Sequence, residues 1–287
     1  MTRQEWQALS YGEKRERFNE AFNQFFRSIG LGIVGFVTAT GELVQFGVRS
    51  IKLALRVPYR WEEIFLHMEF VGNKSIVIIA LSSLFTGLAL STQIYMGFKI
   101  VNMTSMVGPT VGLGVLRELG PVLTGLIVSA RAGGAMAARL GTMRVTEQID
   151  ALEVMGVDPI QYLVSPRIIA TVLVMPLLTA VFDFVAMLGC YVICVYLFDI
   201  DSASMIERTT EWLEPYHLWE GLFKGALFGL FFAVICTYRG YNTKGGAEGV
   251  GNSTNQGVVT SMVMIIVLDF FVTNLINVFY QLTARFT

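Results

Sequence analysis

Long apolar stretches, each with few or no charged residues, dominate the chain after residue 74. The first of them, Ser75–Phe98, contains no charge at all. About 20 such residues in a helix cross the ~30 Å hydrocarbon core of a bilayer. The predicted spans are residues 75–98, about 110–137, 168–198, 221–238 and 257–282. We therefore expect an all-α integral membrane protein with five transmembrane helices.

The segment before these spans mixes charged residues with aromatic ones. An apolar stripe at helical spacing is formed by Phe18, Phe22, Phe25 and Phe26. With basic residues beside it, such a stripe is typical of a helix in the membrane interface, although a helix packed on its own protein would look the same. The uncharged run 28–41 is short for a crossing. We expect residues 28–57 to form one or two amphipathic interfacial helices that do not cross.

Composition agrees with a membrane protein. Hydrophobic residues make up 54% of the chain and charged residues 15%, against roughly 25% in soluble domains. The net charge of −1 predicts no nucleic-acid partner. The three cysteines lie in apolar runs and the two histidines stand alone, so no disulfide framework and no metal site is predicted. The predicted division is interfacial helices over 1–70 and a five-span domain over 71–287.

The distribution of basic residues predicts the orientation. Sixteen of the 21 Lys and Arg residues precede the first span or lie in the connections after the second and fourth spans, and three lie on the other side. Basic residues accumulate in cytoplasmic loops. We expect a cytoplasmic amino terminus and a carboxyl terminus outside.

A few charges lie inside the predicted spans. They are Arg117 and Glu118 in the second, Asp183 in the third, Lys224 in the fourth and Asp269 in the fifth. Charged residues within a membrane are costly and usually face the bundle interior or a wet cavity. Arg117–Glu118 is either a polar spot in a substrate cavity or a structural pair, with Lys224 or Asp269, that sets helix register. Both interpretations can hold together. Asp183 and Asp269 are expected to make hydrogen bonds between helices.

Small residues recur four apart at the end of the second span, as in Gly133 with Ala137 and Gly134 with Ala138. This spacing lets helices approach closely in lipid, within one chain or between two copies. Arg131 and Arg139 lie among them and are expected to snorkel or to meet lipid headgroups.

Residues 144–159, after the second span, predict a short cytoplasmic helix. Thr146 is the expected N-cap, Gly156 ends the helix and Pro159 prevents its continuation. The helix has an apolar side and an acidic side, which suits docking into a partner's groove. A plain surface connector is the alternative. The glycine-rich run 242–257 has no phosphate-loop pattern and is expected to be a flexible connector.

Residues 116–166 contain several motifs in series. They read Leu-Arg-Glu-Leu-Gly-Pro, Ala-Arg-Ala-Gly, Gly-Thr-Met-Arg-Val-Thr-Glu-Gln, Met-Gly-Val-Asp-Pro and Ser-Pro-Arg. This series resembles the permease subunits of MCE-associated ABC lipid transporters, the MlaE/YrbE/TGD1 family. The resemblance extends over roughly residues 70–282.

The resemblance implies a function and a set of partners. The chain would be the permease of an ATP-driven transporter that moves phospholipids or related lipids across the cell envelope. Its partners would be a second copy of itself, ABC ATPase subunits with a possible small accessory subunit, an MCE-domain periplasmic protein and the lipid substrate. ATP and Mg²⁺ would bind the ATPase, so this chain would be no enzyme and hold no cofactor. Its place would be the inner membrane, with the amino terminus cytoplasmic and the carboxyl terminus periplasmic.

The resemblance also implies particular residues. The helix over about 146–156 becomes a coupling helix that enters the ATPase. Its ATPase-coupling residues would be Glu147, Gln148, Asp150, Ala151, Glu153 and Gly156. The lipid-binding cavity would be lined by Leu90, Gly97, Phe98, Val101, Arg117, Glu118 and Leu119. Apart from the resemblance, the charges inside the predicted spans add an intramembrane polar network of Asp183, Lys224 and Asp269 to the candidates.

Two other functions compete with this one. An ion-coupled secondary transporter would use intramembrane carboxylates such as Asp183 and Asp269. A non-transporting membrane scaffold would recruit a soluble partner through the connection between the second and third spans.

Overall fold

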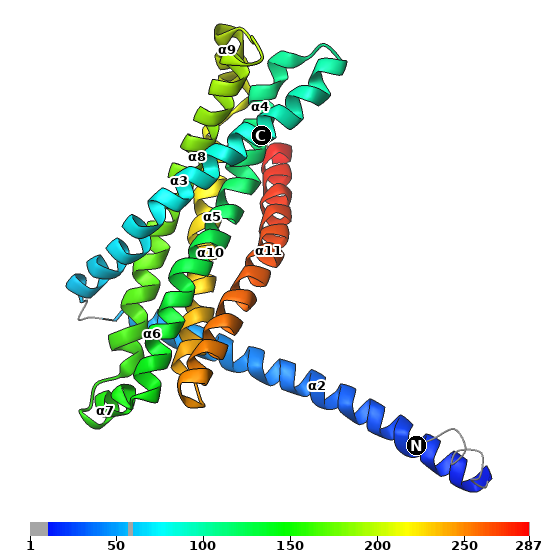
Figure 1. Cartoon of the computed structure of the whole chain (residues 1–287), viewed down its shortest axis with the longest axis vertical. Coiled ribbons are helices and arrows are strands. Elements are labelled where there is room, and N and C mark those ends of the chain that lie inside the picture. The colour runs from blue at the N-terminus through cyan, green and yellow to red at the C-terminus, as the bar shows by residue number, and fades with distance from the viewer. Residues whose placement is uncertain (1–10, 57–59, 287) are drawn as a thin grey trace. The chain divides into compact units, whose positions relative to one another are not determined.

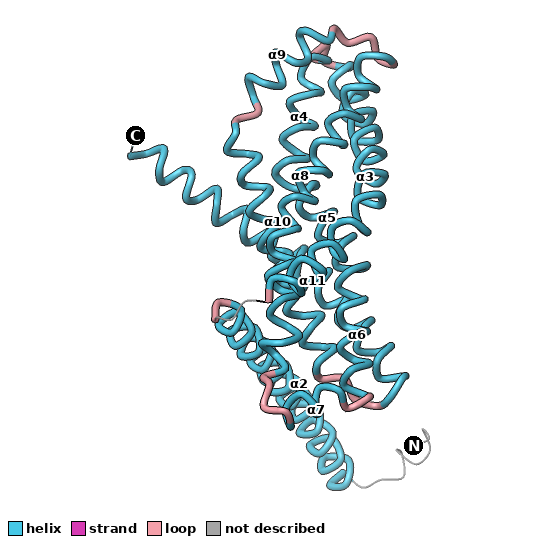
Figure 2. The backbone as a smooth tube through the Cα atoms, turned by 90° about the vertical axis from the view of Figure 1, so that its left-hand side faces the viewer, coloured by secondary structure: helices cyan, strands magenta, loops and turns pink. Residues whose placement is uncertain are grey.

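Every regular element in the described part of the chain is a helix, as expected (Figures 1 and 2). The computed structural model describes residues 11–56 and 60–286. It divides into two compact units, one up to Val48 and one from Arg49 onward. The first unit contains most of α2, Tyr11–Ala54. The aromatic stripe of residues 18–26 lies on α2, but its side chains are outside the described residues.

The second unit is a helical bundle. Its long helices are α3 (Trp61–Ile100), α8 (Ser165–Tyr196), α10 (Pro215–Tyr241) and α11 (Gly246–Phe286). The predicted second span is a nearly continuous helix over residues 104–145. Its segments are η1 (Thr104–Met106), α4 (Val107–Gly114), η2 (Val115–Leu119), α5 (Gly120–Val128), η3 (Ser129–Gly133) and α6 (Gly134–Val145).

Within the described residues, six helices have the length and composition to cross a membrane. Five contain the predicted spans, and the sixth is Gly30–Ala54 at the end of α2. The segment expected to be one or two helices is therefore a single helix up to Ala54. That it lies in the interface without crossing stays a prediction, as does the division into residues 1–70 and 71–287.

The bundle packs through small residues and large apolar ones. Gly87 of α3 lies so close to the backbone of Ala186 on α8 that a Cβ atom there would overlap it. Phe182, Phe228 and Phe232 are completely buried between the helices. Large apolar side chains such as Val77 also cover the outside, as expected of a surface that faces lipid.

The small residues of the second span pack within the chain. A Cβ at Gly133 would lie 2.8 Å from Cys236 Sγ on α10, and one at Gly134 would lie 3.1 Å from Val258 on α11. These two residues pack closely inside one chain, and packing between two copies stays a prediction.

Short helices occupy the two ends of the bundle (Figures 1 and 2). At one end lies α7, Gln148–Val154, and at the other lies α9, Ser202–Trp212. The sequence did not predict α9, which begins where the Asp201 carboxylate accepts a hydrogen bond of 2.8 Å from the Ser204 amide. The predicted flexible connector 242–257 is also wrong in extent, because α11 already begins at Gly246.

Candidate functional site

The Arg117–Glu118 pair lies on a π-helical turn. Residues 115–119 form η2, where the amide of Gly120 donates to the carbonyl of Val115. A π turn holds one more residue per hydrogen-bonded loop than an α turn, and such turns occur frequently at functional sites. The turn places both charged side chains toward α10 and α11, where the structure gives them their partners.

Lys224 on α10 is the centre of these contacts, and its side chain is completely buried. Its Nζ donates to the carbonyl oxygen of Arg117 at 2.6 Å and to Thr273 Oγ1 at 2.7 Å. Three carboxylates surround the ammonium group: Glu118 at 3.2 Å, Asp269 at 3.5 Å and Glu220 at 3.6 Å. A buried ammonium group needs such partners, because burial of an unpaired charge is very costly.

Arg117 makes the second half of the network. Its Nε lies 2.8 Å from Glu220 Oε2, and its Nη2 donates to Asn277 Oδ1 at 2.8 Å. Glu220, at the first turns of α10, therefore contacts both Arg117 and Lys224. The charge network, defined here as Arg117, Glu118, Glu220, Lys224 and Asp269, joins η2, α10 and α11.

Exposure separates the two ends of this network. The side chains of Lys224 and Glu220 are fully buried, whereas those of Arg117 and Glu118 are 26% and 39% exposed. The buried end joins η2, α10 and α11, as a pair that sets helix register would, and the exposed end is accessible, as a polar spot in a cavity would be. Both interpretations of the Arg117–Glu118 pair therefore fit the geometry. Next to the charge network, an apolar recess reaches Glu220 and is lined by Tyr216, Trp219, Phe223 and Ile276.

Sequence reasoning identified only part of this network. Glu220 was missed because it directly precedes the apolar run that begins at Gly221. Its spacing of four residues from Lys224 is the signal that could have revealed it. Thr273 and Asn277 carry no charge and offered no such signal.

Asp183 lies apart from the charge network. It is buried on α8, and neither carboxylate oxygen has a hydrogen-bond partner among the described residues. Its side chain packs so tightly against Gly120 that only a glycine fits there. The structure thus joins Lys224 to Asp269 but leaves the third residue of the predicted polar network without an interhelix hydrogen bond.

The predicted lipid-cavity residues fall into two groups. Arg117, Glu118 and Leu119 lie half-buried on η2. On the last turns of α3, Leu90 and Phe98 are half-buried against the core, while Gly97 is exposed with open space beside it. Val101, just after α3, is 58% exposed. No hydrogen bond or ion pair in the described part of one chain joins the two groups.

The short helix predicted over about residues 146–156 is confirmed as α7, Gln148–Val154, while its coupling role stays a prediction. Its end follows the prediction, because Gly156 has a φ of +77°. The Gly156 amide donates to the backbone carbonyl of Glu153, and the Val157 amide donates to the backbone carbonyl of Leu152. Its start does not. Glu147, with a φ of +60°, precedes the helix, and the Thr146 hydroxyl donates to the carbonyl of Thr142 instead of capping α7.

Side chains of α7 divide between anchoring and exposure. Ile149 is completely buried, Asp150 pairs with Arg144 at 2.5 Å, and Glu153 accepts a hydrogen bond from the Tyr241 hydroxyl at 3.2 Å. The other four predicted coupling residues, Glu147, Gln148, Ala151 and Gly156, are exposed. The most exposed apolar side chain here is Val154, at 89%.

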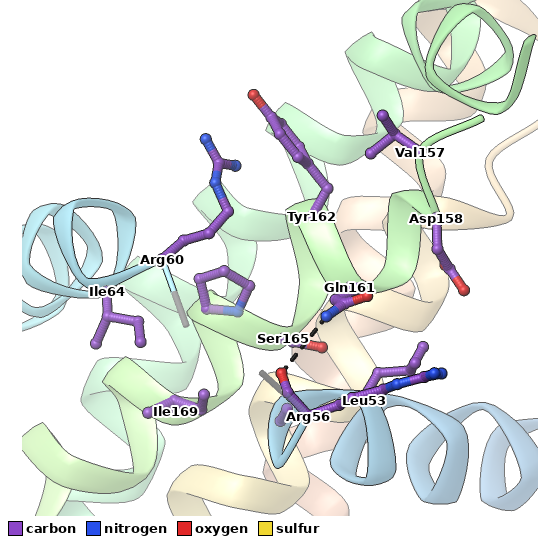
Figure 3. A pocket seen from close by; sticks show the side chains of 12 residues that line it. Leu53, Arg56, Arg60, Ile64, Val157, Asp158, Gln161, Tyr162, Ser165 and Ile169 are labelled. Carbon is purple, nitrogen blue, oxygen red and sulfur yellow. Dashed lines mark hydrogen bonds between the residues drawn. The ribbon is translucent and has the colours of Figure 1, made fainter. Parts of the chain in front are cut away.

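A cavity of about 180 Å³ lies near the same end of the bundle (Figure 3). The last turns of α2, the start of α3 and the π turn η4 (Ile160–Val164) line it. Arg60 lies over the Tyr162 ring at 3.7 Å, and Gln161 donates to the carbonyl of Arg56 at 3.5 Å. None of the predicted lipid-cavity residues lines this cavity.

These features define a multi-span helical membrane protein with a charge network between helices and a short helix exposed at one end. The model of the family described as Permease MlaE matches residues 64–275, which include η2, α7 and the charge network. The chain belongs to the MlaE permease family.

Curated relatives agree with this membership. The chain is 38% identical over 248 residues to a probable ABC transporter permease protein of Rickettsia conorii, covering 86% of this chain and 96% of that one. It is 32% identical to the intermembrane phospholipid transport system permease protein MlaE of Haemophilus influenzae, covering 87% and 96%. It is also similar to the chloroplastic protein TRIGALACTOSYLDIACYLGLYCEROL 1 of Arabidopsis thaliana, at 36% identity over 75% of this chain and 62% of that protein.

Proposed function

We propose that this chain is the permease subunit of an ATP-driven lipid transporter that moves phospholipids or related lipids across the cell envelope. Membership of the MlaE permease family over residues 64–275 carries the proposal. The relative from Haemophilus influenzae is named as part of an intermembrane phospholipid transport system, and the one from Rickettsia conorii as an ABC transporter permease.

The exposed end of the charge network is the proposed contact for the lipid headgroup. Arg117 donates to Glu220 and Asn277 and still keeps 26% of its side chain exposed, so it can also meet a phosphate. The acyl chains would lie against apolar surface, for which Leu90 and Phe98 on α3 and Val101 just after it are the candidates. A second copy of the chain would bring these surfaces together around a shared cavity.

Helix α7 is the proposed docking point for the ATPase subunits. Its buried Ile149 and the Arg144–Asp150 pair hold it to its own chain, while Val154 and Met155 are 89% and 68% exposed. Apolar side chains on an anchored helix suit insertion into a groove. ATP and Mg²⁺ would bind the ATPase, and nucleotide-driven closure would reach the permease through this helix.

The remaining assignments complete the proposed assembly. The chain would lie in the inner membrane, with α7 facing the cytoplasm and α9 facing the periplasm. An MCE-domain protein would sit on the periplasmic side, and a small accessory subunit would bind the ATPase.

Substitution of the exposed end of α7 tests this function. Charge reversal at Asp150 is a poor choice, because it also breaks the pair with Arg144. V154E/M155E instead alters side chains that are largely exposed. We expect ATPase binding in the purified complex to weaken about tenfold or more, as for loss of an interface anchor, and lipid-stimulated ATP hydrolysis to fall with it.

Ile206→Glu provides the control, because Ile206 is a 52% exposed apolar residue on α9, at the opposite end of the bundle. It should leave ATPase binding unchanged. Normal lipid-stimulated ATP hydrolysis in V154E/M155E would show that α7 is a plain connector.

A further inference from the structure

Three cations converge on one aromatic ring between α3 and the second span. The ring is that of Phe70, on α3. Its centroid lies 4.4 Å from the guanidinium carbon of Arg139, 5.2 Å from that of Arg131 and 5.6 Å from the ammonium nitrogen of Lys74. Each cation is within reach of the negative face of the ring.

No carboxylate neutralises these three cations within the described part of the chain. Arg131 donates to Ser75 Oγ at 2.6 Å and to the carbonyl of Phe70 at 3.1 Å, which are neutral acceptors. Lys74 and Arg139 are exposed and form no ion pair there. Glu63, near the start of α3, lies instead within 4.0 Å of Arg60 and His67.

Three like charges around one ring repel one another. A ring quadrupole attracts each cation, but it carries no net charge and cannot cancel their sum. An anion placed between Lys74 and Arg139 would remove this repulsion. A phosphate group suits the arrangement because guanidinium and ammonium groups both donate to its oxygens.

The surface next to the cluster indicates the source of that phosphate. Lys74 is the last charged residue before the apolar run of α3, so it lies at the level where a span meets the headgroups. Val77, Ile78 and Leu81 follow it at three, four and seven residues and are 74%, 46% and 58% exposed. Because residues at this spacing share one helix face, the cations continue into an apolar stripe suited to an acyl chain.

We propose that Lys74, Arg131 and Arg139 bind the phosphate of an anionic phospholipid in the leaflet on the α7 side of the membrane. The site is separate from the charge network, since its residues lie on the first half of α3, on η3 and on α6, whereas the network lies on η2, α10 and α11. A lipid bound here would hold α3 against the end of the second span, where α6 leads into α7.

Titration of the purified full chain with lipid, followed by native mass spectrometry, tests this site. The probes are phosphatidylglycerol and phosphatidylcholine with the same acyl chains. K74Q/R139Q should weaken phosphatidylglycerol binding about tenfold, the effect expected for two basic residues at a membrane surface. Phosphatidylcholine binding should change little, and the charge-preserving K74R/R139K should bind like the wild type.

The matched control is K99Q at the other end of α3. Lys99 lies over the Tyr95 ring at 5.7 Å, nearly the same geometry as Lys74 over Phe70, and no second cation of the described residues lies over that ring. It should bind phosphatidylglycerol like the wild type. If the double variant does not fold, the single variants K74Q and R139Q are measured instead, and each should weaken phosphatidylglycerol binding.

Three results would overturn the proposal. One is equal phosphatidylglycerol binding by K74Q/R139Q and wild type. Another is an equal loss of phosphatidylglycerol binding in K99Q, which would indicate that any basic residue contributes and that no specific site exists. The third is displacement of the lipid by excess inorganic phosphate, which would make a free anion rather than a lipid the ligand.

Discussion

Lys224 illustrates what a charged residue requires in the interior of this bundle. Its ammonium group has no exposed surface, and it lies within 3.6 Å of Glu118, Glu220 and Asp269. Attraction to these carboxylates, together with hydrogen bonds to Arg117 and Thr273, offsets the cost of burial. The stabilisation depends on these partners, because Lys224 without them would be a buried unpaired charge.

Lys224→Met should therefore be strongly destabilising. It keeps the size of the side chain but leaves the carboxylates without their shared cation, at a cost of about 3–5 kcal/mol. Thermal unfolding of the purified protein in detergent measures it. K224M/D269N removes both charges of one pair and should recover much of the loss. Equal melting temperatures for wild type and K224M would contradict the account.

The residues of this network differ in how far the sequence could predict them. Lys224 and Asp269 stand out as single charges in apolar runs, and their proximity was an open alternative. Glu220 and Asn277 did not stand out, because one precedes a run and the other is neutral. Their burial and pairing depend on how α10 packs on η2 and α11, which spacing along the chain does not determine.

At the scale of elements, close helix crossings define the bundle. Gly87 on α3 faces the backbone of Ala186 on α8, with no room for a side chain between them. Small residues at such points allow backbones to approach in lipid, where van der Waals packing rather than hydrophobic burial holds helices together.

Gly87→Ala should push α3 away from α8. The added methyl would overlap the Ala186 backbone, and overpacking of this kind costs about 1–3 kcal/mol. The melting temperature in detergent should fall. Gly114→Ala is the control, because nothing lies within 4 Å of a Cβ at that position. If both variants melt alike, the α3–α8 crossing is not tightly constrained.

The short elements show the limits of local patterns. The end of α7 was predicted because Gly156 accommodates a positive φ, which is a local property. Its start was not, because Glu147 adopts the left-handed conformation that Asn and Gly favour more strongly. The π turns η2 and η3 lie inside a run that looks like ordinary helix, since insertion of a residue leaves no periodic signal.

At the scale of the whole molecule, hydrophobic runs predicted the helical class and the five helices α3, the second span, α8, α10 and α11. The sixth candidate, Gly30–Ala54, has the length and composition of a span as well. Its uncharged part is short and basic residues follow it, which is why the sequence favours an interfacial position. The orientation, with the amino terminus cytoplasmic, rests on the same charge distribution and stays a prediction.

Membership of the MlaE permease family makes the association with an ATPase the central claim about the molecule. The decisive measurement is native mass spectrometry of the complex purified from its membrane through a tag on this chain. We predict two copies of the chain, a stoichiometric set of nucleotide-binding subunits and bound phospholipid. A chain that purifies without any ATPase subunit, yet moves its substrate along an ion gradient after reconstitution, would contradict the account.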